Sequence, residues 1–60
     1  MDRLKSMKVK LKQKMNYVVE PLLLGKVYDV ISMEKGWYRI QTELDEDYLF
    51  PPSLFDIVEE

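Results

Sequence analysis

The sequence predicts a small all-β barrel, and three observations favour that fold class. Short apolar segments rich in Val, Ile, Tyr and Phe alternate with turn signals at intervals of about 8–12 residues, the spacing of small barrels. With 60 residues, the chain is long enough for one domain only. It has no cysteine, and 47% of its residues are apolar, so packing alone must hold the core together. We therefore expect a five-stranded barrel in residues 7–60, after a flexible N-terminal tail in residues 1–6.

The first expected strand covers residues 7–15, where apolar and charged side chains alternate. Val9 and Leu11 belong to its apolar face. The opposite face carries Lys8, Lys10, Lys12 and Lys14. A repeat of two residues predicts a half-buried strand. A helix is the alternative, because four apolar residues also stand at helical spacing, although Val9 falls outside their stripe. These four are Leu4, Met7, Leu11 and Met15.

An irregular segment separates this strand from the next one. Pro21 lacks the N–H group that a strand ladder needs, so residues 16–24 are expected to form a loop. Gly25 permits a turn into a second strand over residues 26–32, which is rich in Val, Ile and Tyr. Residues 33–36 end in glycine and indicate a short hairpin loop.

Two more strands follow in the second half of the chain. Residues 37–42 alternate, with Tyr38 and Ile40 on one face, and predict the third strand. Residues 43–47 are mostly acidic and indicate a turn. Residues 48–50 are apolar and predict the fourth strand.

Two consecutive prolines, Pro51 and Pro52, end the fourth strand. Proline favours a tight turn at such a position, so we expect a short 3₁₀ turn near Pro51–Leu54. Residues 55–58 then predict a fifth strand.

Three motifs make this sequence resemble SH3-like domains. The family's second strand carries a Gly-x-x-aromatic-x-Val pattern, and Gly25, Tyr28 and Val30 match it. Its third strand opens with a tryptophan followed by an aromatic residue, and Trp37 and Tyr38 match that pair.

The third motif is a Pro-Ser-x-aromatic corner. Residues 52–55 read Pro-Ser-Leu-Phe, and Ile57 and Val58 follow them as in the family. More narrowly, the chain resembles small single-domain SH3-like proteins of Gram-positive bacteria and their phages, whose first strand begins Met-Lys-Val-Lys as residues 7–10 do. The resemblance covers residues 7–58 and implies an SH3-like five-stranded barrel.

In the peptide-binding branch of this family, a groove of aromatic side chains docks polyproline helices. The resemblance implies that Trp37, Pro52 and Phe55 would line such a groove. For Phe55, a place in the core or in the groove floor is the alternative. The loop after the first strand adds Tyr17 and Glu20. The aromatic-rich first-strand motif of that branch is absent, because the first strand is rich in lysine. The class of ligand therefore stays open.

The expected function is a cytoplasmic, monomeric protein-interaction module that binds a protein or peptide around Trp37. Alternation puts Trp37 on the face opposite Tyr38 and Ile40, and an exposed large aromatic side chain is a common recognition anchor. Trp37 covering one open end of the barrel is the alternative. The expected contact surface comprises Trp37, Phe55, Pro52, Tyr17, Glu20 and Glu34, whose two glutamates and the acidic turn would select a basic ligand.

Charge is unevenly distributed along the chain, which leaves other functions open. Residues 1–14 have a net charge of +5, and residues 15–60 have a net charge of −7. The row Lys8, Lys10, Lys12 and Lys14 could track the phosphates of a nucleic acid. Mutual attraction of the two segments across the fold explains the same pattern. A further alternative is a structural subunit that adds to a sheet edge in a larger assembly.

The residue inventory argues against catalysis, metal binding and membrane spanning. Without histidine or cysteine, the chain lacks the commonest general base and the thiolates that bind metals. The acidic turn lacks the spacing of a calcium-binding loop. No apolar run approaches the roughly 20 residues that cross a bilayer. We therefore expect no enzymatic activity and no cofactor.

Overall fold

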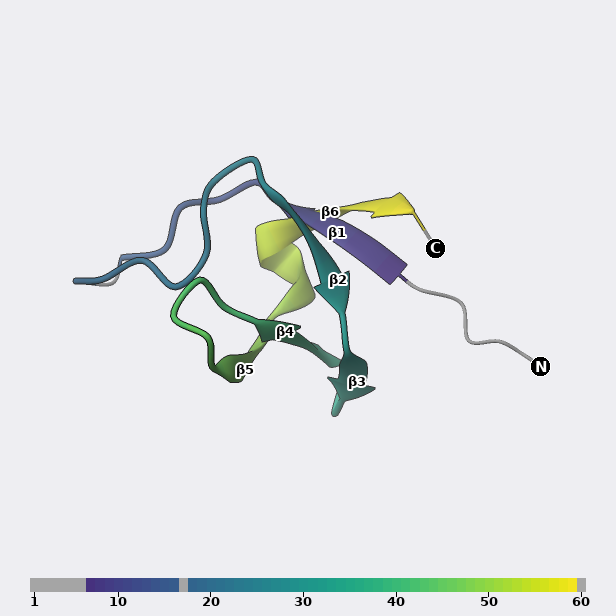
Figure 1. Ribbon diagram of the computed structural model, residues 1–60. Helices are drawn as coiled ribbons and strands as arrows, with labels where there is room; N and C mark the ends of the chain where they lie inside the picture. The colour runs from purple at the N-terminus through teal and green to yellow at the C-terminus, as the bar shows by residue number, and fades with distance from the viewer. Residues whose placement is uncertain (1–6, 17, 60) are drawn as a thin grey trace.

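Figure 1 shows a computed structural model of the chain, which describes residues 7–16 and 18–59. The strands are β1 (Met7–Leu11), β2 (Val27–Val30), β3 (Ser32–Glu34), β4 (Trp37–Gln41), β5 (Asp47–Phe50) and β6 (Phe55–Glu59). They form two three-stranded antiparallel sheets, ordered β2-β1-β6 and β3-β4-β5. The predicted all-β class is confirmed, but the strands of the described residues do not join into one closed ladder. The predicted tail, residues 1–6, lies outside the described residues.

The first strand is shorter than the alternation predicts. It ends at Leu11, which is opposite Phe55, the first residue of β6, so β1 has no ladder partner on that side beyond this point. The Lys12 N–H instead donates to the Leu54 carbonyl at 2.9 Å. Met15 is nevertheless buried in the core. Because the strand stops, Lys12 and Lys14 do not continue the strand face of Lys8 and Lys10, which corrects the prediction of a single lysine row.

The second predicted strand is divided between the two sheets. Its first part, β2, pairs with β1, and its second part, β3, pairs with β4. Between them, the Ile31 N–H donates to the carbonyl of Arg39 in β4 at 2.8 Å. The chain thus passes from one sheet to the other within a single residue (Figure 1).

The hairpin between β3 and β4 has a turn of two residues rather than the predicted four. Lys35 has a φ of 54° and Gly36 a φ of 80°. Positive φ at both central positions gives a two-residue turn a twist that matches that of its flanking strands. Met33 and Glu34, predicted to be loop, are therefore part of β3.

The C-terminal part of the fold agrees closely with the sequence. Strands β4, β5 and β6 lie within one residue of their expected limits. The predicted 3₁₀ turn is confirmed as η1 (Pro52–Leu54), in which the Leu54 N–H donates to the Pro51 carbonyl at 3.2 Å.

One cluster of apolar side chains forms the core. Its buried members are Val9, Leu11, Met15, Leu22, Tyr28, Tyr38, Ile40, Phe50 and Phe55. They come from both sheets, and the Phe55 ring lies 5.7 Å from that of Tyr38 and 6.3 Å from that of Phe50. Aromatic packing at this range stabilises the contact between the sheets beyond the burial of area alone.

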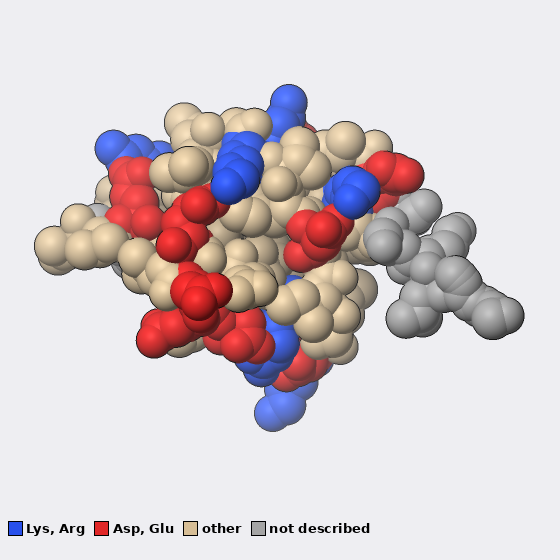
Figure 2. Space-filling model, in the orientation of Figure 1, with Lys and Arg blue, Asp and Glu red and all other residues tan. Residues whose placement is uncertain are grey.

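Opposite charges are interspersed over the surface (Figure 2). Lysines of the basic N-terminal segment pair with carboxylates elsewhere: Lys8 with Asp29 at 2.5 Å, Lys12 with Asp56 at 3.3 Å and Lys14 with Glu20 at 3.2 Å. The hydrogen bond from Lys8 to Asp29 also raises the pKa of that lysine. Three lysines of the basic segment are therefore neutralised by carboxylates within the fold.

Candidate functional site

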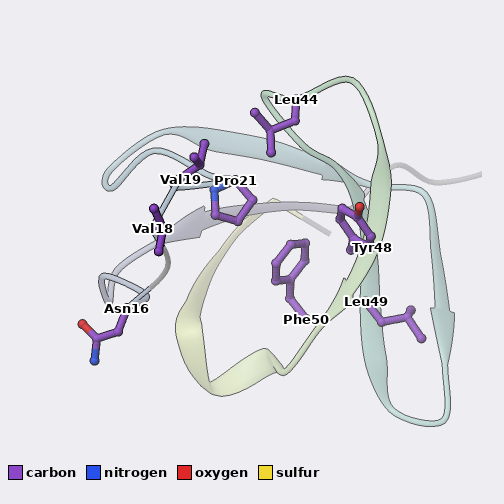
Figure 3. Close-up of a pocket in the computed structure, with 8 residues that line it drawn as sticks. All are labelled: Asn16, Val18, Val19, Pro21, Leu44, Tyr48, Leu49 and Phe50. Carbon is purple, nitrogen blue, oxygen red and sulfur yellow. The ribbon is translucent and has the colours of Figure 1, made fainter.

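A hollow of about 620 Å³ lies between the loop after β1 and strand β5 (Figure 3). We call it the β5 groove. Its lining is Asn16, Val18, Val19, Pro21, Leu44, Tyr48, Leu49 and Phe50. Figure 3 shows Val19 and Pro21 facing Tyr48 and Phe50 across the hollow, with Leu44 above them.

Pairing of β5 with β4 sets the direction of the aromatic side chains in the groove. Tyr48 is opposite Ile40, and Phe50 is opposite Tyr38, so both aromatic rings are on the core side of the sheet. Phe50 is 3% exposed and closes the floor of the groove. Tyr48 lies nearer the open end and is 48% exposed.

Apolar side chains remain in water around this floor. Val18 is fully exposed, Val19 is 59% exposed and Leu44 is 48% exposed. Isolated exposed apolar residues are ordinary, but several around one hollow mark a binding surface. The β5 groove is therefore the strongest candidate site in the described part of the chain.

A hydrogen-bond network joins the two walls of the groove. The Glu43 N–H donates to the Pro21 carbonyl at 2.8 Å. The Tyr28 hydroxyl donates to the Glu43 carboxylate at 2.7 Å and accepts from the Leu23 N–H at 2.8 Å. Lys26 Nζ also donates to that carboxylate, at 2.6 Å. We call this network the Tyr28–Glu43 clamp; it fixes Pro21 and the turn that bears Leu44 relative to one another.

Tyr28 and Glu43 are both held in the protonation state that the hydrogen bonds of the clamp require. Burial raises the pKa of Tyr28 to about 12, with a further contribution from Glu43 against the lowering effect of the Leu23 N–H. The hydrogen bonds from Lys26 and Tyr28 lower the pKa of Glu43. At neutral pH the hydroxyl therefore keeps its proton, and the carboxylate stays ionised to accept it.

The turn between β4 and β5 gives the groove an acidic rim. Figure 2 shows acidic side chains gathered over this turn, at the lower left. Asp47 pairs with Arg39 at 3.1 Å, whereas Asp45 accepts from the Gln41 amide at 2.7 Å and Glu46 from the Tyr48 hydroxyl. That bond to Glu46 raises the pKa of Tyr48. Within residues 7–16 and 18–59, neither Asp45 nor Glu46 forms an ion pair with lysine or arginine.

Residues predicted to form one aromatic surface have different environments. Trp37 begins β4, is 46% exposed on the face opposite Tyr38 and Ile40 as predicted, and does not line the β5 groove. Phe55 is only 5% exposed and belongs to the core, so the structure offers no free aromatic face there. Pro52 is half-buried in η1.

The two glutamates predicted to select a ligand are engaged within the fold. Glu34, the register partner of Trp37, accepts two hydrogen bonds from the Arg39 guanidinium, at 2.6 and 2.9 Å. Glu20 pairs with Lys14. The predicted contact residue Tyr17 lies outside the described residues.

Sequence reasoning did not single out the residues of the β5 groove. Their signal is apolar side chains at positions that local pattern assigns to exposed loops: Val18 and Val19 in the long loop, and Leu44 within the acidic turn. An apolar side chain that no residue of its own segment covers indicates a candidate binding surface.

No protein-family model matches this sequence, and comparison with curated proteins and with solved structures finds no match. In residues 7–16 and 18–59, no group of three or more acidic, histidine or cysteine side chains could hold a metal ion. The same residues include no helix that is long and apolar enough to span a bilayer.

Proposed function

We propose that this chain is a small SH3-like protein-interaction module that binds a segment of a partner protein in the β5 groove. The observation that carries the proposal is the combination of an apolar floor with exposed apolar walls. Phe50 closes a hollow of about 620 Å³ around which Val19, Leu44 and Tyr48 are each about half exposed. Covering these side chains removes apolar surface from water, which favours association.

The barrel assignment is supported by how the chain changes sheets. A strand that bends at one residue and continues in a second sheet makes the corner of a barrel-like packing. The step at Ile31 is such a corner, and the η1 turn joins β5 of one sheet to β6 of the other.

The chemistry of the lining supports binding rather than catalysis. Asn16 and Tyr48 contribute the polar side chains of the groove. Glu46 raises the pKa of Tyr48, so this hydroxyl is a poorer general base or nucleophile than a free tyrosine at neutral pH.

Peptides selected from a random linear library against the folded protein would test this proposal. Their affinity for the wild type should fall by about tenfold or more in Leu44→Ser, because a groove wall is removed. Trp37→Ala is the matched control, since Trp37 is exposed to a similar degree and lies outside the lining; it should change affinity by less than about twofold.

The reverse pattern would contradict the proposal. Loss of binding in Trp37→Ala with full binding in Leu44→Ser would assign recognition to the aromatic surface around Trp37. Circular dichroism of both variants should show the wild-type spectrum, because each replaced side chain is about half exposed to solvent.

A further inference from the structure

We infer that the segment bound in the β5 groove is an extended basic peptide, in which a large apolar side chain enters the groove and a flanking lysine or arginine meets Asp45 and Glu46. This inference rests on the proposed function of the groove and adds the chemistry of the partner.

The apolar anchor follows from the size and the lining of the hollow. Its volume of about 620 Å³ falls within the range of about 300–1,000 Å³ that is typical of ligand sites. Phe50 provides an apolar floor, and Pro21 and Tyr48 face each other across it (Figure 3). A large aliphatic or aromatic side chain is complementary to such a space.

The extended conformation follows from the position of the groove along β5. Tyr48 and Leu49 point to opposite faces of the strand, and Figure 3 shows Leu49 on the side away from Phe50. Because Tyr48, Leu49 and Phe50 all line the hollow, the hollow runs along β5. Among the described residues, β5 pairs in its sheet only with β4, so its other edge is available to an extended chain.

The positive charge of the peptide is inferred from the acidic residues that already form ion pairs. Glu43 is held by Lys26, Asp47 by Arg39 and, on the opposite wall, Glu20 by Lys14. Asp45 and Glu46 have polar but uncharged donors among the described residues.

Both residues belong to the turn that carries Leu44, one wall of the groove. Asp45 follows Leu44 directly, and Glu46 accepts the hydroxyl of Tyr48. A peptide anchored between Leu44 and Tyr48 therefore passes the turn that carries both carboxylates, and a cation there is favoured over an anion.

A second copy of this chain is a poorer occupant for the same reason. A two-fold contact through the groove uses the same surface on both subunits, so it would bring two copies of the acidic turn together. Like charges at an interface oppose association.

The test uses the peptides enriched from a random linear library by the wild-type protein. We expect these peptides to combine a large apolar residue with at least one lysine or arginine. Affinity of a synthetic peptide of this kind should fall about fivefold or more in the double variant Asp45→Asn with Glu46→Gln, and should also fall as salt is added. Both replacements keep a hydrogen-bond acceptor for Gln41 and Tyr48.

The control removes the same two charges elsewhere, in the double variant Asp29→Asn with Glu59→Gln, on β2 and β6 of the other sheet. It should change affinity by less than about twofold, because these residues belong to the other sheet and not to the turn that carries Leu44.

The possible results distinguish a wrong partner chemistry from a wrong binding site. Enriched peptides that are neutral or acidic, yet lose binding in Leu44→Ser, would overturn the basic partner and leave the groove as the site. Failure to enrich any peptide, or binding unaffected by Leu44→Ser, would overturn both. Self-association by sedimentation that Leu44→Ser abolishes would assign the groove to a second copy and also overturn the basic partner.

Discussion

The hydroxyl of Tyr28 donates a hydrogen bond of 2.7 Å to the carboxylate of Glu43, a residue 15 positions further along the chain. Tyr28 is in β2 of one sheet, and Glu43 is in the turn that leaves β4 of the other. The bond therefore ties the two sheets together at the end of the molecule where the β5 groove opens.

Replacing Tyr28 with phenylalanine should destabilise the protein by about 1–2 kcal/mol, because the Leu23 N–H and the Glu43 carboxylate each lose a part-buried hydrogen bond. Urea unfolding followed by tryptophan fluorescence measures the change. Tyr48→Phe is the control, since its hydroxyl bonds Glu46 at an exposed position, and it should leave the midpoint nearly unchanged. Equal midpoints for Tyr28→Phe and the wild type would show that the clamp does not stabilise the fold.

Stability should fall as the solution is acidified below about pH 4.5. The hydrogen bonds from Arg39 and Ser32 lower the pKa of Glu34 to about 2, and Lys26 and Tyr28 lower that of Glu43. A carboxyl group whose pKa is lower in the folded state stabilises the fold above its unfolded pKa. This contribution is lost as the pH falls towards the folded pKa. Urea midpoints measured between about pH 6 and pH 2 should therefore decrease.

The variant Glu34→Gln isolates one part of this dependence. It removes the titrating group but keeps a side chain that can accept from Arg39. Its urea midpoint should vary less over the same pH range than that of the wild type. A profile as steep as that of the wild type would mean that Glu34 does not contribute to it.

The turn between β3 and β4 should respond in opposite directions to two substitutions. Gly36→Ala should destabilise by about 1 kcal/mol, because alanine is strained at a φ of 80°. Apart from Gly36 and its two chain neighbours, no heavy atom of the described residues lies within 4 Å of the added Cβ, so this effect is conformational. Lys35→Asn should stabilise by a few tenths of a kcal/mol, since asparagine tolerates a φ of 54° better than lysine. Thermal unfolding measures both shifts, and a shared sign would contradict the turn geometry.

Nucleic acid should not bind Lys8, Lys10, Lys12 and Lys14 measurably. Lys8, Lys12 and Lys14 are each paired with a carboxylate, so a phosphate would have to displace an internal partner. A gel-shift assay with single- and double-stranded DNA and RNA at low salt should show no complex. A salt-sensitive shift that disappears in Lys10→Ala and Lys12→Ala would restore the nucleic-acid hypothesis.

Local pattern predicted much of this fold because each strand buries one face. The alternation at Val9 and Leu11, and at Tyr38 and Ile40, is a direct record of which side chains enter the core. The ends of a strand were not predictable in this way where they depend on pairing with a strand far away in the sequence. The first strand stops at Leu11 because β6 begins opposite it, and the second divides at Ile31 because its two halves pair with different strands.

The candidate site was less predictable than the fold, because it is made by proximity. Val19, Leu44 and Tyr48 belong to three separate segments, and no local pattern relates them. Strand alternation and the resemblance to SH3-like domains favoured Trp37 and Phe55, yet Phe55 packs inside the core. The sequence marked exposed and buried positions well, but the distances between segments depend on the clamp and on the sheet register.

The bond between the Glu43 N–H and the Pro21 carbonyl joins main-chain atoms, so it does not depend on the side chains that line the groove. Val18, Val19 and Leu44 are at least about half exposed and contribute little to the core. Their identities can therefore change while both walls keep their positions. Ligand preference and folding are then separable traits in this chain, and a library randomised at these three positions should yield folded variants with new binding specificities.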